Sequence, residues 1–346
     1  MKIAIVTVYG GHNYGSYWQG RTLYDYLITL GHDVYFYDTN SRNIKFFLVT
    51  ALKSAVKLNI KKSIFYFRLH RYFKNNLKEV KAINSKKDLA DFDLMIFGSD
   101  EIWNVKRDDM RSYPEFWGLG FEGIKKISYA PSINLATSED LRKNGFENAL
   151  NDFFAVSVRD EFSASEIRKI FKGEVCEVLD PTFLFDDSYY KKMPMQPIKD
   201  SYIGVYYFDL TDEEYVKMRS LADFLKLKLV RIGAYDKRFD QCIISKNVFC
   251  YFLNADYIIT NTFHGTAFSI NFNKQLIVFN PHKLAKIDNL LRKFDLSDRE
   301  MTDFSADEII KFVSGNHIDW TERKTQIDEA REYSRNFLKR TINYLS

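Results

Sequence analysis

The sequence has little cysteine, little proline and no long apolar run. Its three cysteines (Cys176, Cys242 and Cys250) show no Cys/His ligand spacing, which argues against a disulfide framework and against a structural zinc site. No window approaches the roughly 18 uncharged apolar residues of a membrane-spanning helix. The apolar run Lys2–Val8 is soon followed by glycines, so it is too short for the apolar core of a signal peptide. We therefore expect a cytoplasmic protein without a metal site.

The composition is that of a folded globular protein. Of 346 residues, 46% are apolar and 16% aromatic, so the chain can bury a sizeable core, and its length predicts two domains. A net charge of +4, taken alone, argues against a strongly basic surface that binds nucleic acid.

That charge is unevenly spread. The segment from Arg42 to Lys87 holds thirteen basic residues and one acid, Glu79, so it carries +12 and the rest of the chain −8. Apolar residues recur in it at helical spacing, a pattern typical of helices that lie on anionic membranes. Two alternatives stay open: a helical hairpin whose lysines are only solvated and, less favoured, a nucleic-acid surface.

Short apolar runs alternate with helical patterns along the chain. We expect strands at Lys2–Val8, His32–Tyr37, Phe92–Phe97, Ile127–Ala130, Phe154–Val158, Glu174–Val178, Tyr202–Phe208, Lys228–Ile232, Tyr257–Thr260 and Leu276–Phe279. Helices are expected at about Ser16–Leu30, Ser163–Phe171, Thr211–Leu225, Lys246–Leu253, from His264, and at Asp319–Tyr344. This alternation predicts an α/β fold with two Rossmann-like, doubly wound domains that face a cleft.

The domain boundary is expected close to a proline-rich stretch. Three of the six prolines fall between Asp180 and Ser201, which predicts a linker. The expected parts are an N-terminal domain, 1–183, with the basic insertion 42–87; a C-terminal domain, 184–318; and a helix, 319–346, that crosses back to the N-terminal domain. Ligands of such sheets bind at the carboxyl ends of the strands.

A glycine-bearing turn follows the first strand. Asn13, Tyr14 and Gly15 precede a predicted helix, whose free N–H groups attract an anion or a sugar. The alternative is an ordinary tight turn capped by Asn13. The turn matches no dinucleotide fingerprint.

A second polar cluster follows the strand that ends at Phe97. Ser99, Asp100 and Trp103 lie there, and we expect the carboxylate to accept hydrogen bonds from sugar hydroxyls and the indole to stack on a sugar ring. A capped helix start with a core tryptophan is the alternative.

Arg159 lies just past another strand end. A guanidinium there predicts a bidentate clamp for a carboxylate or a phosphate, chemistry that lysine does not reproduce. A capping network with Asp160 or Glu161 is the alternative.

The last cluster surrounds His264, with Thr262, Phe263, Gly265 and Thr266 as its neighbours. A histidine at a helix start can exchange a proton at neutral pH, and the helix dipole favours its neutral, basic form. We interpret His264 as a catalytic acid or base; a structural cap is the alternative.

Taken in order, six segments resemble the polysaccharide pyruvyltransferase family. They are NYGSYWQGRTLYDYL (Asn13–Leu27), FGSDEIWN (Phe97–Asn104), SYAPSI (Ser128–Ile133), VSVRDEFS (Val156–Ser163), VLDPTFLF (Val178–Phe185) and NTFHGTAFSINFNKQLIVFN (Asn261–Asn280). The resemblance lies in their order and spacing, and it covers most of the chain outside the basic segment and the final helix.

The resemblance implies a GT-B-like fold and an enzyme that transfers pyruvate from phosphoenolpyruvate, as a cyclic ketal, to a sugar of a cell-surface polysaccharide or its lipid-linked precursor. It implies no cofactor besides this donor substrate, with the N-terminal domain on the acceptor side and the C-terminal domain on the donor side. His264 would transfer the proton and Arg159 would hold an anion. The acceptor wall would comprise Asn13, Tyr14, Gly15, Ser99 and Asp100.

One position departs from the family pattern. Two residues before the histidine, the branches best tied to pyruvylation carry arginine, whereas this chain has Thr262. Either Arg159, Lys274 or Lys283 then balances the charge of the donor, or the donor differs.

Two other functions stay open. One is a GT-B-type glycosyltransferase that uses a nucleotide sugar, and the other is a non-catalytic glycan- or membrane-binding protein. We expect no nucleic-acid partner, and the basic segment 42–87 offers a peripheral contact with the inner face of an anionic membrane.

Overall fold

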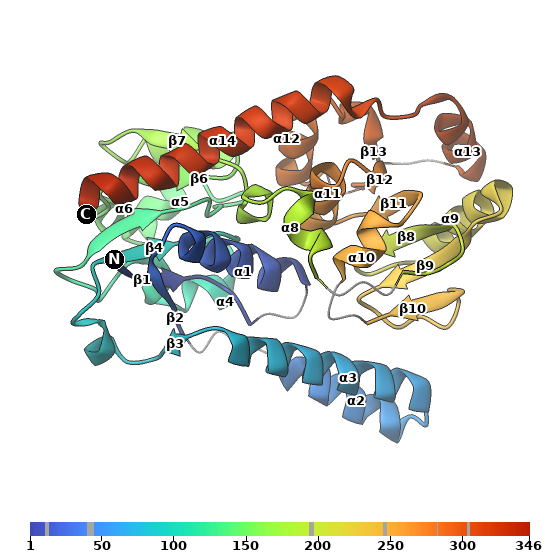
Figure 1. The fold of residues 1–346 in the computed structure, drawn as a ribbon, viewed down its shortest axis with the longest axis horizontal. Helices are drawn as coiled ribbons and strands as arrows, with labels where there is room; N and C mark the ends of the chain where they lie inside the picture. The colour runs from blue at the N-terminus through green and yellow to red at the C-terminus, as the bar shows by residue number, and fades with distance from the viewer. Residues whose placement is uncertain (11–13, 40–44, 194–196, 245–247, 282, 303–304) are drawn as a thin grey trace. The chain divides into compact units, whose positions relative to one another are not determined.

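The chain folds into two compact units (Figure 1). The computed structural model describes residues 1–10, 14–39, 45–193, 197–244, 248–281, 283–302 and 305–346, and of residues 45–47 the backbone alone. Unit 1 comprises Met1–Ile44, Phe73–Phe185 and Glu329–Ser346, and unit 2 comprises Lys45–Tyr72 and Asp186–Asp328. Most of the helical part of the basic segment thus groups with unit 2, whereas the sequence assigned the whole segment to the N-terminal domain.

All strand pairs of both main sheets are parallel, which confirms the α/β prediction. The sheet of unit 1 has the order β3-β2-β1-β4-β5 and that of unit 2 the order β10-β9-β8-β11-β12-β13. The strands are β1 Lys2–Val6, β2 Asp33–Tyr37, β3 Ala82–Ile83, β4 Leu94–Phe97, β5 Lys125–Ser128, β6 Val156–Val158, β7 Val175–Glu177, β8 Tyr202–Tyr206, β9 Lys228–Ile232, β10 Gln241–Ile243, β11 Tyr257–Thr260, β12 Gln275–Phe279 and β13 Glu300–Met301.

Helices connect most of the strands. They are α1 Tyr14–Thr29, α2 Lys45–Val56, α3 Ile60–Asn76, α4 Asp108–Arg111, α5 Ser138–Lys143, α6 Phe146–Leu150, α7 Glu161–Arg168, α8 Asp187–Lys191, α9 Asp212–Leu225, α10 Phe249–Leu253, α11 Phe263–Asn271, α12 Ala285–Lys293, α13 Ala306–Gly315 and α14 Trp320–Leu345. Short 3-10 helices lie at Leu77–Glu79, Lys86–Leu89, Pro114–Trp117, Pro181–Phe183 and Ser297–Arg299. The predicted linker after Asp180 therefore contains one of these turns and α8.

The sheet of unit 1 has a core on each face because successive side chains along a strand point to opposite faces of the sheet. Ala4 and Val6 belong to one buried cluster, whereas Ile3 and Ile5 belong to the other. The end of α14 completes the second cluster with Leu338, Ile342 and Leu345. The residues Glu329–Ser346 of this final helix thus group with unit 1.

In unit 2, α9 and α13 cover one face of the sheet. Met218 and Leu221 of α9 and Ile309 of α13 pack with Val205 and Ile259 of the central strands. Thr211 begins α9 with the predicted capping box, in which its hydroxyl accepts from the Glu214 N–H while the Glu214 carboxylate accepts from the Thr211 N–H. Local sequence therefore defines where this helix starts.

Candidate functional site

Polar side chains converge at the carboxyl ends of the strands of unit 1. Asp180, just before a 3-10 turn, connects several of them, and its side chain is fully buried. Its Oδ1 accepts from the Thr182 N–H and hydroxyl at 3.0 and 2.9 Å, and its Oδ2 lies 3.0 Å from both Arg159 Nη1 and Ser99 Oγ. Asp180 was not among the predicted site residues, although it lies within the quoted VLDPTFLF segment.

Arg159 is buried between two carboxylates. Its Nη1 lies 3.0 Å from Asp180 Oδ2, and its Nη2 lies 3.7 Å from Asp100 Oδ1. Burial lowers its pKa, but the carboxylates of Asp180 and Asp100 outweigh burial and leave the pKa raised. Asp160, and not Arg159, caps α7, since its Oδ1 accepts from the Ser163 N–H at 2.8 Å. The anion clamp stays a prediction, and any anion there competes with these two carboxylates.

The start of α1 joins the same network. Ser16 donates to Asp100 Oδ2 at 3.0 Å, while Tyr14 and Gly15 are buried. Gln19, which the sequence did not single out, accepts from the Ser99 N–H and donates to Thr7, to the Val8 carbonyl and to that of Ser16. Predicted residues Ser99 and Asp100 thus belong to one hydrogen-bonded corner, Tyr14 and Gly15 are buried in the first turn of α1 that contributes Ser16 to it, and Asn13 lies outside the described residues.

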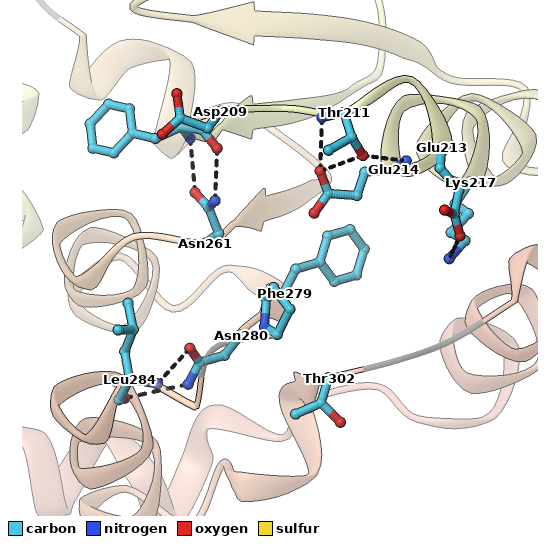
Figure 2. Close-up of a pocket in the computed structure, with 12 residues that line it drawn as sticks. Asp209, Thr211, Glu213, Glu214, Lys217, Asn261, Phe279, Asn280, Leu284 and Thr302 are labelled. Atoms are coloured by element: carbon cyan, nitrogen blue, oxygen red, sulfur yellow. Dashed lines mark hydrogen bonds and ion pairs between the residues drawn. The ribbon is translucent and has the colours of Figure 1, made fainter.

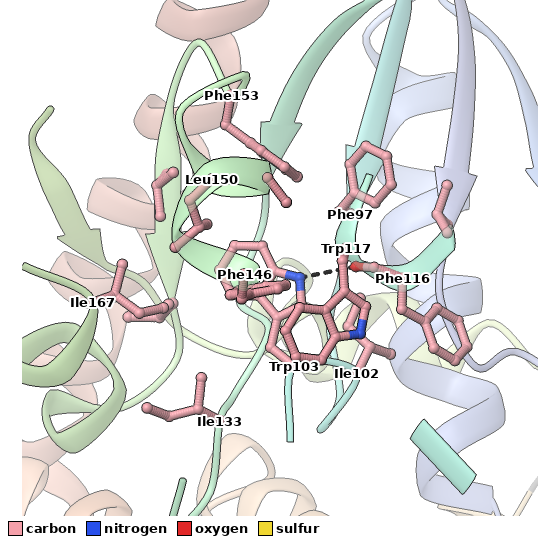
Figure 3. Close-up of a cluster of buried hydrophobic side chains, with 14 of the residues drawn as sticks. Phe97, Ile102, Trp103, Phe116, Trp117, Ile133, Phe146, Leu150, Phe153 and Ile167 are labelled. Atoms are coloured by element: carbon pink, nitrogen blue, oxygen red, sulfur yellow. Dashed lines mark hydrogen bonds between the residues drawn. The ribbon is translucent and has the colours of Figure 1, made fainter. Parts of the chain in front are cut away.

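Trp103 lies in the apolar core (Figure 3). Its side chain has no exposed surface, its Nε1 donates to the Phe116 carbonyl at 2.9 Å, and its ring packs edge-on against Phe146 and Phe153. This is the alternative that the sequence left open, a core tryptophan. The ring therefore has no free face for a sugar in this structure.

The corresponding corner of unit 2 is the turn from β11 into α11. Thr262 is the N-cap, and its Oγ1 accepts from the Gly265 N–H at 2.9 Å and lies 3.0 Å from Thr260 Oγ1. A Cβ on Gly265 would lie 2.1 Å from Thr260 Oγ1, so only glycine fits. Thr266 is fully buried and donates to the Thr262 carbonyl at 2.9 Å.

His264 is half-buried in the first turn of α11, and its Nε2 is removed from solvent. Its ring contacts those of Phe263 and Phe268, with centroid distances of 5.3 and 6.3 Å. Thr262, Phe263, Gly265 and Thr266, the other predicted residues of this cluster, are buried around it. The arrangement holds the histidine at a helix N-terminus, as predicted.

A pocket of about 510 Å³ opens at the carboxyl edge of the same sheet (Figure 2). It follows β8, β11, β12 and β13, and it is lined by Phe208, Asp209, Thr211, Glu213, Glu214, Lys217, Asn261, Phe279, Asn280, Pro281, Leu284 and Thr302. Asn261 exchanges two hydrogen bonds with the backbone of Phe208, at 2.9 and 2.8 Å, and so joins two of the loops. Three carboxylates against one ammonium make the lining acidic.

Arg231, near the end of β9, is a third residue that the sequence analysis did not select. It is 5% exposed, and its Nη2 donates to the Tyr207 carbonyl at 2.5 Å. Its Nε and Nη1 are buried and have no hydrogen-bond partner among the described residues. Asp236, the acid whose charge acts on Arg231, is held by Arg238, whose Nε lies 2.9 and 3.0 Å from the two carboxylate oxygens. Burial, only partly opposed by Asp236, lowers the pKa of Arg231.

The two lysines proposed as substitutes for the family arginine lie at different edges of the sheet. Lys274 precedes β12, at the amino edge, and its Nζ donates to the Leu253 carbonyl at 3.1 Å. Lys283 follows β12, at the carboxyl edge, and is exposed. Among the described residues, no cluster of His, Cys, Asp and Glu side chains has the makings of a metal site.

Comparison with known proteins gives the family. The model of the family described as polysaccharide pyruvyl transferase matches residues 13–283, which include every motif segment quoted above. No curated protein matches the chain.

Solved structures give the fold. A glycosyltransferase involved in avilamycin A biosynthesis is 11% identical with a TM-score of 0.54, and the match covers 100% of this chain and 98% of that one. The UDP-GlcNAc 2-epimerase from Methanocaldococcus jannaschii is 10% identical with a TM-score of 0.53, covering 97% and 100%. A putative UDP-N-acetylglucosamine 2-epimerase from Listeria monocytogenes is 7% identical with a TM-score of 0.52, covering 96% and 91%. These likenesses confirm the predicted GT-B-like fold and carry no information on substrate.

Proposed function

The chain belongs to the polysaccharide pyruvyl transferase family, and on that premise we propose that it forms a pyruvate ketal on a sugar with phosphoenolpyruvate as donor. The family match over residues 13–283 is the observation that carries this proposal. The acceptor is a sugar of a cell-surface polysaccharide or of its lipid-linked precursor. The reaction takes place in the cytoplasm and uses no cofactor besides the donor.

The proposed chemistry moves two protons. One sugar hydroxyl adds to the enol carbon of phosphoenolpyruvate while the methylene carbon takes up a proton and becomes the methyl group. A second hydroxyl of the same sugar then attacks that carbon, the bond to phosphate oxygen breaks, and phosphate leaves with the second proton. The protein must deprotonate hydroxyls, protonate carbon and hold two anionic groups.

His264 is the residue we assign to proton transfer. It lies at the N-terminus of α11, where the helix dipole favours the neutral imidazole that a general base needs. The Thr260–Thr262 hydroxyl pair and the absence of a side chain at Gly265 define the turn that carries it. Thr262 caps the helix and its side chain is uncharged, so it does not replace the charge of the family arginine.

Arg231 is the residue we assign to the donor's negative charge. In the sheet of unit 2, β9 and β11 flank β8, so side chains at their carboxyl ends are about 10 Å apart. Arg231 has two buried donors, Nε and Nη1, that have no hydrogen-bond partner among the described residues. A carboxylate or phosphate would satisfy both donors, as arginine commonly does with planar anions.

The acidic pocket at the carboxyl edge of the unit 2 sheet suits the sugar acceptor. Three lining carboxylates repel a donor that carries a carboxylate and a phosphate, but they accept hydrogen bonds from sugar hydroxyls. Phe208, which is 46% exposed, gives an apolar face on which a pyranose ring can stack. We therefore propose this pocket as a sugar subsite of unit 2, in addition to the predicted acceptor wall of the N-terminal domain.

Release of phosphate tests the proposal. The protein is incubated with phosphoenolpyruvate and a panel of lipid-linked and free saccharides, and phosphate and the ketal product are both measured. We expect acceptor-dependent release that His264→Gln reduces by about 100-fold or more. His317→Gln is the matched control, because that exposed histidine lies at the opposite edge of the sheet, 3.4 Å from Tyr257 Oη.

Two results would replace the proposal by an alternative. Sugar transfer from a nucleotide sugar, with no phosphate release from phosphoenolpyruvate, would make the protein a glycosyltransferase of the same fold. Glycan modification in cells that is unchanged by His264→Gln would indicate a non-catalytic glycan- or membrane-binding protein.

A further inference from the structure

An unusual concentration of exposed apolar side chains lies on α2, α3 and the turn between them. Seven of the sixteen large apolar side chains that are exposed among the described residues belong to this hairpin: Val49, Leu52, Val56, Leu58, Ile60, Ile64 and Phe67. The three around the turn are exposed most, Val56 by 84%, Leu58 by 85% and Ile60 by 67%. Large exposed apolar patches on folded proteins commonly mark a surface that meets a partner or a membrane.

The exposed residues form a stripe on each helix. Val49, Leu52 and Val56 follow the i, i+3, i+7 spacing along α2, and Ile60, Ile64 and Phe67 follow i, i+4, i+7 along α3. Leu58 lies in the turn between the two helices and is also exposed. We call these exposed apolar residues of the two helices and the turn the apolar stripe.

A different set of residues packs the hairpin onto the protein. Ala51, Ser54, Phe65, Leu69 and Tyr72 are buried. Within unit 2, the Phe65 ring lies 5.9 Å from that of Tyr235. Each helix therefore has one buried face and one exposed apolar face, and the exposed face is not needed for packing.

Basic residues flank the stripe with a regular offset. Each follows an exposed apolar residue by one position, as in Leu52-Lys53, Val56-Lys57, Ile60-Lys61 and Phe67-Arg68. These four basic side chains are exposed. Over residues 45–72 the sequence has seven basic residues and no acid. An apolar stripe bordered by cations matches the interface of an anionic bilayer, where apolar groups reach the acyl chains and cations meet lipid phosphates.

We propose that the α2–α3 hairpin docks the protein on an anionic lipid bilayer, with Val56, Leu58 and Ile60 inserted below the headgroups. The charge pattern favours this partner over a second copy of the chain, because an isologous contact would bring two surfaces with seven positive charges together. It also favours a bilayer over nucleic acid, since a nucleic-acid surface gains nothing from the apolar stripe. No described helix is both long and apolar enough to cross a membrane.

Vesicle binding tests the proposal without substrate, so its result is independent of the pyruvyl transfer proposed above. The whole protein is sedimented with vesicles of phosphatidylglycerol and phosphatidylcholine, and with phosphatidylcholine alone. One variant combines Val56→Ser, Leu58→Ser and Ile60→Ser, and a second combines Lys53→Gln, Lys57→Gln and Lys61→Gln. The matched control is Val216→Ser with Phe224→Ser, two side chains of α9 that are 59% and 54% exposed.

We expect binding to the anionic vesicles that weakens as salt is raised. The serine variant should lose about 100-fold or more in partitioning, because burying each aliphatic side chain contributes about tenfold. The glutamine variant should lose its preference for anionic lipid, the control should bind as the parent does, and all variants should unfold at the parent's midpoint. Absence of binding at low salt, binding that the serine substitutions leave unchanged, or self-association that they abolish would each overturn the proposal.

Discussion

Arg159 Nη1 lies 3.0 Å from Asp180 Oδ2, and both side chains are almost completely removed from solvent. This pair links the end of β6 to the turn after β7, at the centre of the polar corner of unit 1. A buried ion pair contributes little net stability. Removing one partner, however, leaves the other charge buried without compensation, which is unfavourable.

Asp180→Asn should therefore lower the free energy of unfolding by about 3 to 5 kcal/mol. Glu147→Gln is the control, since it removes one partner of the exposed Arg142–Glu147 pair, 3.1 Å apart, and should cost less than about 1 kcal/mol. Urea unfolding of both variants measures the difference. Equal, small losses would show that the buried charge of Arg159 is balanced elsewhere.

Gly265→Ala should destabilise the protein by about 1 to 3 kcal/mol and reduce activity, because its Cβ would overlap Thr260 Oγ1 and force the turn that carries His264 to move. Gly315→Ala is the matched control, since no atom lies within 4 Å of a Cβ built there. Thermal unfolding and phosphate release are measured on both. A Gly265→Ala variant with the parent's stability and rate would contradict this account of the turn.

Arg231→Met should separate stability from function. The apolar side chain removes a buried guanidinium, two of whose donors have no partner among the described residues, so the free energy of unfolding should stay unchanged or rise by about 1 to 3 kcal/mol. The KM for phosphoenolpyruvate should rise at least about tenfold while the KM for the saccharide stays the same. Arg299→Met, at another buried arginine, one that pairs with Asp298 at 2.8 Å, should not change either KM. A donor KM that Arg231→Met leaves unchanged would remove Arg231 from the proposed site.

Stability should fall at high pH through buried tyrosines. Burial raises the pKa of Tyr17 to about 12, against the opposing effect of Arg21, and burial likewise raises the pKa of Tyr26 to about 12. The unfolded chain ionises near pH 10, so the stabilisation is complete below about pH 10 and is lost as the pH rises toward about 12. Urea unfolding across this range measures the loss, and Tyr17→Phe should make it smaller. Tyr344→Phe, which alters an exposed ring, should not.

Much of the fold could be predicted because local patterns and packing agree. The strands Lys228–Ile232 and Tyr257–Thr260 have the bounds that their apolar runs predict, and Thr211 begins α9 as its capping box predicts. The strands β3, β10 and β13 were missed because two or three residues are too few to show a periodicity. Residues 45–72 group with unit 2, and the contact that Phe65 makes there is a tertiary one that no local sequence pattern predicts.

The candidate site was predictable only where a residue type at a strand end indicates its chemistry. His264 and Arg159 could be chosen in this way. The ion pair of Arg159, the burial of Arg231 and the core position of Trp103 all depend on segments that are distant in the sequence, such as those of Asp180 and Phe146. Ion pairing and burial are tertiary properties. The position of a residue at a strand end therefore makes it a candidate, but it does not distinguish a side chain that binds a ligand from one that stabilises the fold.

Transfer of label from phosphoenolpyruvate tests the central claim most directly. The donor carries isotope in its pyruvyl carbons, the saccharide acceptor is varied, and the product sugar is examined by nuclear magnetic resonance and mass spectrometry. The account predicts label in a cyclic ketal on the sugar, one phosphate released per ketal formed, and neither with His264→Gln. Label that stays in phosphoenolpyruvate or appears only as free pyruvate with every acceptor, while His317→Gln and the parent behave alike, would contradict it.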